Sequence, residues 1–175
     1  SGNFVTARPV GIRNGKDFHH TGEVRRIDRK AISDLLDKGD IVLLSSMGYS
    51  PTGEIINLNM KDVTTQTAIA LNAEKLICFS KQEGIKNGAH ELIRELTPAQ
   101  GRIVIEEHPE NSSDALNGLE AACKVCEQDV NRAHLISYVE DGALIKELFT
   151  VDGSGTLICK EPYEKIRRAT IEDIV

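Results

Sequence analysis

Short apolar runs alternate along this chain with stretches that carry a helical pattern, and this alternation constrains the fold more than any other feature. The strand-like runs are IVLLSS at 41–46, KLICFS at 75–80, HLISYV at 134–139 and GTLIC at 155–159. Because the first of these is continuously apolar, it predicts a fully buried strand. Strands that alternate with helices are typical of an α/β protein with a mostly parallel sheet, and we predict that class.

Polar caps mark where the predicted helices begin. Asp28 and Asn59 each precede a periodic apolar stretch and are predicted N-caps. A longer helix is predicted over residues 114–128, with an inward face of small and apolar residues that includes CKVC. The short stretch GALIKELF is predicted to be capped by Asp141. Three apolar residues of that stretch are predicted to face inward, namely Leu144, Ile145 and Leu148.

Length and charge exclude several classes of protein. The chain has 175 residues, of which 40% are hydrophobic and 27% are charged, with a formal net charge of −6. That length suffices for one domain with its own core. The apolar runs fall far short of the roughly 20 residues that a membrane span needs. An acidic balance argues against a nucleic-acid surface, which requires clustered basic charge. We expect neither a membrane nor nucleic acid as a partner.

The four cysteines, Cys78, Cys123, Cys126 and Cys159, all lie in apolar contexts. Cys123 and Cys126 have CxxC spacing, but they fall on the apolar face of the predicted helix, far from its N-terminus. A redox pair is typically placed at the N-terminus, where the helix dipole lowers the thiol pKa. A zinc site would need a second pair of ligands at suitable spacing, and none is obvious. We therefore predict reduced thiols in the core and no metal site.

The stretch 48–62, GYSPTGEIINLNMKD, combines glycines, a proline and two asparagines between a predicted strand and a helix N-terminus. In α/β folds small ligands bind outside the carboxyl ends of the strands, and the free N–H groups of a helix start bind anions. Gly48, Asn57 and Asn59 are therefore candidate pocket residues. Turn and capping roles explain the same residues equally well, so both interpretations stay open.

Common signatures of nucleotide binding and nucleophilic catalysis are missing from the sequence. It has no Walker-type glycine loop and no G-x-S-x-G nucleophile elbow. GIRNG and DGSGT lack the glycine spacing of a dinucleotide site. These motifs therefore give no support to a nucleotide-dependent or hydrolytic enzyme.

The run ELFTVDGSGT places an acidic residue near the end of a short predicted helix, just before two glycines. Glu147 lies off the main apolar stripe and near the C-terminal end of the helix. At that end the helix dipole favours cations, and the last backbone carbonyls lack hydrogen-bond donors. With the backbone exposed at Gly153 and Gly155, its carboxylate would form a receptor for a donor-rich cation. Guanidinium fits best, because it has five donors and no acceptor. The alternative is an exposed glutamate followed by a glycine C-cap.

Several stretches closely resemble the N-acetylglutamate synthases: SGNFVTARPVGIRNGKDFHHTGEVRRID, GYSPTGEIINLN, and HLISYVEDGALIKELFTVDGSGTLI followed by YEKIRRATIEDIV. In that family an amino-acid-kinase-like domain, a three-layer α/β/α sandwich, precedes an acetyltransferase domain of the GNAT type. The resemblance implies that residues 1–160 are the C-terminal portion of the kinase-like, arginine-binding domain, incomplete at its N-terminus. It implies that residues 161–175 are a linker and the first strand of a truncated acetyltransferase domain.

The resemblance also implies an activity for the intact protein. It would transfer acetyl from acetyl-CoA to L-glutamate in the first step of arginine biosynthesis, under feedback regulation by L-arginine. Acetyl-CoA and the catalytic residues would belong to the acetyltransferase domain, so we expect this segment to hold no catalytic residue and no metal. Family members assemble through the kinase-like domain, which predicts a homo-oligomer. A cytoplasmic location is expected, with an organelle as the alternative.

Carried over by position, the resemblance assigns an effector site to the run 134–155. Glu147 would pair with the guanidinium of arginine bidentately. The backbone around Gly153 and Gly155 would accept its remaining donors. His134 and Ser137 would line the pocket.

Two other interpretations stay open, an acetylglutamate kinase and a non-catalytic arginine-sensing domain. Related kinases carry N-x-N-A-D at a helix start, whereas NLNMK here keeps Asn57 and Asn59 but has Lys61 in place of the aspartate. A lysine of the kinases is also absent, with Asn117 and Gly118 at its place. Phosphoryl transfer depends on cationic clamps and positioning. The resemblance therefore implies a vestigial substrate pocket formed by Asn57, Asn59 and Gly48.

Overall fold

Two four-stranded sheets and the helices around them make up the described part of the chain. The computed structural model describes residues 3–108, 113–150 and 153–160. The strands are β1 (Val5–Pro9), β2 (Ile12–Arg13), β3 (Lys16–Asp17), β4 (Gly22–Ile27), β5 (Met47–Tyr49), β6 (Ile55–Asn57), β7 (Lys75–Ser80), β8 (Glu95–Leu96), β9 (Arg132–Ser137) and β10 (Thr156–Cys159). The helices are α1 (Arg29–Leu36), α2 (Met60–Leu71), α3 (Pro98–Glu106), α4 (Asp114–Glu127) and α5 (Ala143–Phe149).

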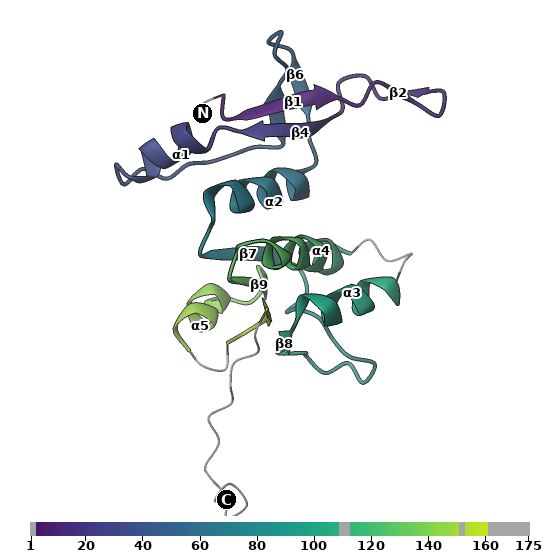
Figure 1. Cartoon of the computed structure of the whole chain (residues 1–175). Helices are drawn as coiled ribbons and strands as arrows, with labels where there is room; N and C mark the ends of the chain where they lie inside the picture. The colour runs from purple at the N-terminus through teal and green to yellow at the C-terminus, as the bar shows by residue number, and fades with distance from the viewer. Residues whose placement is uncertain (1–2, 109–112, 151–152, 161–175) are drawn as a thin grey trace, which may run out of the picture.

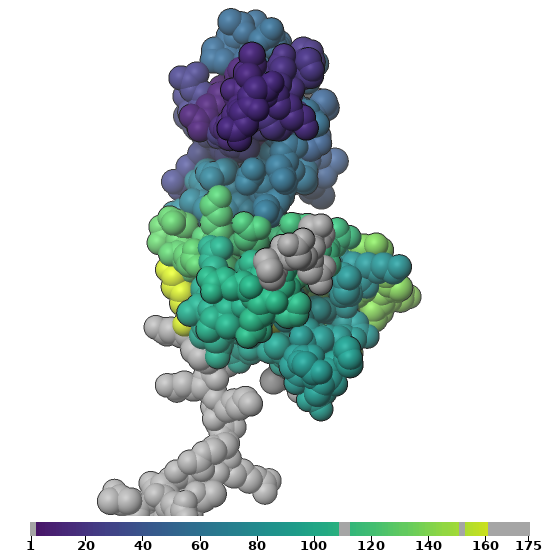
Figure 2. All heavy atoms as spheres, turned by 90° about the vertical axis from the view of Figure 1, so that its right-hand side faces the viewer, coloured from purple at the N-terminus to yellow at the C-terminus, as the bar shows by residue number. Residues whose placement is uncertain are grey.

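The two sheets lie at opposite ends of the described molecule. The first has the strand order β4-β1-β5-β6 and the second β7-β9-β10-β8, and β2 and β3 form a separate hairpin. Helix α2 lies between the two ends and packs against both β4 and α4 (Figure 1). Figure 2 shows the same division, with the N-terminal residues gathered at one end and the green and yellow residues at the other.

The α/β class is confirmed, but the sheets are mixed where the sequence predicts a mostly parallel sheet. β7 pairs parallel with β9 after a crossover that contains α3 and α4. β5 pairs antiparallel with β6, and β1 with β4, because short turns and a hairpin connect these strands without a crossover. Connection length does not decide every strand direction, since β9 and β10 pair antiparallel although α5 lies between them in the chain.

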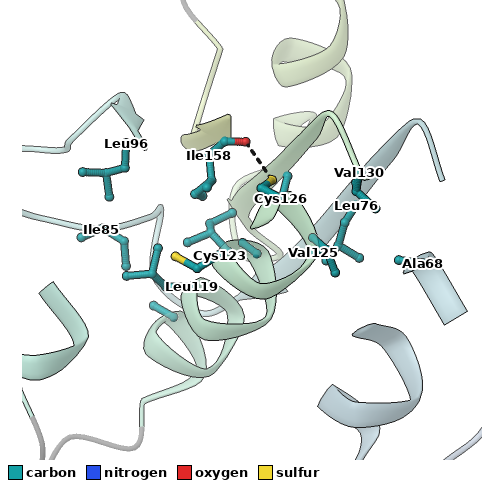
Figure 3. Close-up of a cluster of buried hydrophobic side chains, with 14 residues drawn as sticks. Ala68, Leu76, Ile85, Leu96, Leu119, Cys123, Val125, Cys126, Val130 and Ile158 are labelled. Atoms are coloured by element: carbon teal, nitrogen blue, oxygen red, sulfur yellow. Dashed lines mark hydrogen bonds between the residues drawn. The ribbon is translucent and has the colours of Figure 1, made fainter. Parts of the chain in front are cut away.

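The larger core lies between α4 and the second sheet (Figure 3). The prediction of a helix over 114–128 is confirmed, with Ser113 as its N-cap. Leu119, Cys123 and Cys126 are fully buried, and the Cys126 thiol donates to the carbonyl oxygen of Ile158 on β10. The cysteines of CKVC thus pack in the core as predicted. Burying a leucine such as Leu119 completely stabilises the fold by roughly 1.5–3 kcal/mol.

The predicted buried strand at 41–46 is wrong. These residues form no strand, and the strand of this region is β5, which begins only at Met47. Ile41 and Leu43 are 88% and 81% exposed, while Leu44 packs against the smaller core. The apolar run lies beside the first sheet without a ladder partner among the described residues. An apolar run predicts burial only if another element covers both of its faces.

The face that α5 turns inward also differs from the prediction. Its N-cap is Gly142, which makes no side-chain capping bond, so the predicted Asp141 cap is wrong. Ile145 is 66% exposed and Leu144 is 38% exposed, whereas Ala143 is buried. Ala143 and Glu147 are four residues apart and share one helix face. That face, and not the apolar stripe, packs on β9.

The capping predictions for α1 and α2 are confirmed. The Asp28 carboxylate accepts from the N–H of Ala31, and the Asn59 side chain accepts from the N–H of Lys61. Helix α3 was not predicted, although TPAQ carries its signal, because Thr97 and Gln100 form a reciprocal capping box around the first turn. No helix in the described ranges is long and apolar enough to cross a membrane.

Candidate functional site

The strongest candidate site is the buried carboxylate of Glu147, which α5 holds against β9. Nδ1 of His134 lies 2.7 Å from Oε1 of Glu147. The other oxygen, Oε2, accepts the backbone N–H groups of Ser154 at 2.6 Å and of Gly155 at 2.9 Å. The side chains of Glu147 and His134 are only 5% and 9% exposed. Three elements, β9, α5 and the turn before β10, therefore meet at one carboxylate.

The Glu147 carboxylate is held in its ionised form. Burial by itself raises its pKa. The hydrogen bonds from His134 and from the N–H groups of Ser154 and Gly155 outweigh burial and lower the pKa from 4.5 to about 2. Hydrogen bonds to the charged form favour that form. The site is thus a fixed negative charge over the whole physiological pH range.

Both glycines of the turn are required for its close approach to Glu147. Gly153 has φ +63°, and a Cβ there would lie 2.6 Å from Oε2 of Glu147. A Cβ on Gly155 would overlap the carbonyl oxygen of Leu135 on the neighbouring strand. Glycine permits the positive φ at the first position and the close backbone contact at the second. The turn therefore delivers its N–H groups to the carboxylate only with glycine at both places.

Four of the five predicted effector residues come together at this site. His134, Glu147, Gly153 and Gly155 meet as described. Ser137 does not join them, because its hydroxyl donates to the carbonyl of Lys81 and accepts from the N–H of Val139.

Sequence reasoning missed Ser154. Its N–H binds Glu147, and its hydroxyl donates to the carbonyl oxygen of Ala143. The only signal for it was its position between the two glycines of DGSGT.

Two polar groups at the site have unused hydrogen-bonding capacity. Nε2 of His134 is buried and has no hydrogen-bond partner among the described residues. The carbonyl oxygen of Gly153 accepts a long contact of 3.5 Å from the guanidinium of Arg94. That distance makes the bond weak. The Gly153 carbonyl is therefore accessible to a guanidinium group.

The predicted vestigial pocket is divided in the structure. Asn59 lines a small cavity of about 130 Å³ at the N-terminus of α2, together with Lys61 and Glu120. The Lys61 ammonium lies 2.5 Å from Oε2 of Glu120 on α4, so an ion pair lies where the kinases carry their aspartate. Gly48 and Asn57 do not line this cavity and pair within the β5–β6 ladder instead.

Gly118, at the position where the related kinases carry a lysine, is closely packed against neighbouring side chains. A Cβ on Gly118 would lie 3.0 Å from Cδ2 of Leu135 and 3.3 Å from Cβ of Cys78. Contacts this short force the neighbours to shift. A long cationic side chain at this position would therefore disturb the packing of α4 on the second sheet.

The described residues contain no group of three or more His, Cys, Asp or Glu side chains that could hold a metal ion. Burial raises the pKa of the Cys78 and Cys123 thiols to about 11 and that of Cys126 to about 12. These thiols are therefore protonated at neutral pH, the form that neither attacks an electrophile nor binds a metal.

The chain is similar in sequence to one protein family and to several known proteins. A profile of the Amino acid kinase family matches residues 1–137. An amino-acid acetyltransferase of Azotobacter vinelandii is 54% identical over 173 residues, which cover 99% of this chain and 40% of the relative. The chain thus spans about 40% of the length of the curated relatives that it matches.

Two solved structures share the fold closely. N-acetylglutamate synthase from Neisseria gonorrhoeae, complexed with coenzyme A and L-arginine, superimposes with a TM-score of 0.85 at 34% identity. This match covers 98% of the present chain and 40% of the Neisseria chain. The same enzyme complexed with coenzyme A and N-acetyl-glutamate gives a TM-score of 0.83 at 34% identity, over 99% and 40% of the two chains.

Proposed function

The chain belongs to the amino acid kinase family, and from that premise we propose that it is the effector-binding part of an N-acetylglutamate synthase and binds L-arginine. The intact protein would transfer acetyl from acetyl-CoA to L-glutamate. Relatives named amino-acid acetyltransferase and the Neisseria complexes with coenzyme A, L-arginine and N-acetyl-glutamate support this proposal. Acetyl-CoA and L-glutamate would bind to parts of the enzyme outside this chain. As the sequence resemblance implies, the enzyme would be a cytoplasmic homo-oligomer.

The ionised, buried carboxylate of Glu147 is the observation that carries the proposal. A buried charge requires a partner that neutralises it. In the free chain His134 and two N–H groups occupy its oxygens. A guanidinium has planar paired donors that match a carboxylate bidentately. It would therefore compete with His134 for Glu147.

We propose that arginine binds by exchange and not by addition. The carboxylate already accepts three hydrogen bonds, so an incoming guanidinium must displace at least one donor. Displacing His134 would free Oε1 for the guanidinium and leave the N–H groups of Ser154 and Gly155 on Oε2. The Gly153 carbonyl, which already accepts a guanidinium N–H of Arg94, would take a remaining donor of the ligand. The proposed effector residues are Glu147, Gly153, Gly155 and His134, whereas the hydroxyl of Ser137 is engaged by Lys81 and Val139.

A kinase function has less support. Lys61 and Glu120 form an ion pair where phosphoryl transfer would need a free aspartate, and a lysine in place of Gly118 would require Leu135 and Cys78 to shift. Two elements of the kinase mechanism are thus absent.

The test is calorimetric titration of the intact protein with L-arginine, in parallel for wild type, Glu147→Gln and Glu140→Gln. Glu140 is an exposed carboxylate near the same helix and serves as the matched control. We expect Glu147→Gln to weaken arginine binding by at least about tenfold, as the loss of a buried charge-assisted partner implies. Glu140→Gln should bind arginine like wild type, and acetyl transfer without arginine should be unchanged in both variants.

L-citrulline provides a second control, because a neutral urea group replaces the guanidinium. It should bind far more weakly than L-arginine to wild type. Equal affinity for the two ligands, or unchanged arginine affinity in Glu147→Gln, would contradict the assignment.

A further inference from the structure

The outer face of the first sheet carries a second concave site, far along the chain from Glu147. Its geometry begins with a β-bulge between β1 and β4. Thr6 pairs with Arg26 and Ala7 pairs with Val24, so Arg25 is an extra residue without a partner in the ladder. A bulge places two consecutive residues opposite one and redirects their side chains.

The bulge explains why two neighbouring arginines face the same side. Ala7 is fully buried, and Val24 packs against the smaller core. In a regular strand, Arg25 and Arg26 would point to opposite faces. With the extra residue, both line one cavity of about 470 Å³ on the outer face. Tyr49, which pairs with Thr6 in the β1–β5 ladder, lines it from the next strand.

The charge of this cavity is uncompensated. The described residues that line it include no carboxylate. The nearby carboxylate of Glu23 is already engaged by Arg8 and Arg13, at 2.8 Å and 2.7 Å. Among the described residues, no side-chain hydrogen bond or ion pair engages the guanidinium group of Arg25 or Arg26. Both groups therefore keep their positive charge, although the formal net charge of the chain is −6.

We propose that the cavity, referred to below as the bulge site, binds a small molecule that carries a phosphate group. Two guanidinium forks match the several oxygens of a phosphate and its charge of nearly −2. The Tyr49 phenol and the Thr6 hydroxyl add neutral donors. Its volume falls in the range of roughly 300–1,000 Å³ that small-molecule sites occupy, so the site has room for a free phosphate or for a small phosphorylated molecule. This inference does not depend on the arginine site.

The experiment is calorimetric titration of the full chain with pyrophosphate at constant ionic strength. We expect binding to wild type and a loss of at least about tenfold in Arg25→Gln/Arg26→Gln, since hydrogen bonds to charged groups contribute the most. Arg29→Gln removes the same charge from the start of α1, outside the cavity, and should bind like wild type. Glutarate, a dicarboxylate, should bind at least about tenfold more weakly than pyrophosphate.

Two further arms complete the test. Coenzyme A as a competitor identifies the source of the phosphate: displacement of pyrophosphate indicates a phosphorylated organic ligand, and failure to displace it indicates a free phosphate. Either result supports the bulge site.

Circular dichroism checks that the variants are folded. If the double variant is unfolded, the single variants Arg25→Gln and Arg26→Gln replace it. No binding of pyrophosphate at millimolar concentration, an equal loss in Arg29→Gln, or single variants that bind like wild type would overturn the proposal.

Discussion

Nδ1 of His134 and Oε1 of Glu147 lie 2.7 Å apart, and both side chains are more than nine-tenths buried. The pair joins β9 to α5. Because water is excluded, salt screens it much less than a surface pair. Its charge therefore has consequences for stability as well as for ligand binding.

Glu147→Gln should change how stability depends on pH. The pKa of Glu147 falls from 4.5 to about 2 on folding, so its ionised form stabilises the native state above pH 4.5. That contribution is lost as the pH falls from about 4.5 toward about 2. We expect wild type to exceed Glu147→Gln by about 1–3 kcal/mol at pH 7 and by much less at pH 3. Urea unfolding at the two pH values measures this.

Glu140→Gln is the control for that experiment, since Glu140 is exposed and its contribution should be small at both pH values. A gap between wild type and Glu147→Gln that is equally large at pH 7 and pH 3 would refute the role of the ionised carboxylate.

Gly155→Ala should destabilise the fold through steric overlap. The new Cβ would collide with the carbonyl oxygen of Leu135 and approach Ile136 at 2.9 Å. Overlaps of this kind typically cost about 1–3 kcal/mol. Gly88→Ala is the matched control, because nothing lies within 4 Å of the added methyl group. Thermal unfolding should show a lower midpoint for Gly155→Ala only. Equal unfolding midpoints for the two variants would show that the turn accommodates the added methyl group without loss of stability, which would contradict the prediction.

The Lys61–Glu120 pair should contribute little to stability despite its short distance of 2.5 Å. The two side chains are 27% and 44% exposed, and partly exposed pairs contribute about 0.2–1 kcal/mol. A double-mutant cycle with Lys61→Ala and Glu120→Ala measures the coupling. Lys30→Ala with Glu120→Ala is the reference cycle and should give a coupling near zero, because Lys30 lies on α1 and pairs with Asp34. A coupling well above the stated range would indicate that the pair fixes the packing of α2 on α4.

The thiols should be unreactive in the native chain. Burial raises the pKa of Cys78 from 9.0 to about 11, which lowers the thiolate fraction at pH 8 roughly a hundredfold. Cys123, Cys126 and Cys159 are more buried and have similarly raised pKa values. An aromatic disulfide reagent should label the native chain at least about a hundredfold more slowly than the denatured chain. A native thiol that reacts at the denatured rate would contradict this.

The sequence by itself determined the features that depend on neighbours a few residues away. Asp28 and Asn59 cap their helices because the acceptor and the free N–H lie within one turn. Cys123 and Cys126 enter the core because helical spacing places them on one apolar face with Leu119. The α/β class follows from the order of such local elements.

Only the tertiary structure decided which surfaces are covered and which distant groups meet. Ile41 and Leu43 are as apolar as any core residue, yet they are exposed because no described strand lies against them. Arg25 and Arg26 share a face because of a register shift that no local pattern encodes. Glu147 is buried beside His134 because packing on β9 selects one face of α5. Local sequence fixes conformation within a turn or two, whereas register and packing depend on residues that are remote in the chain.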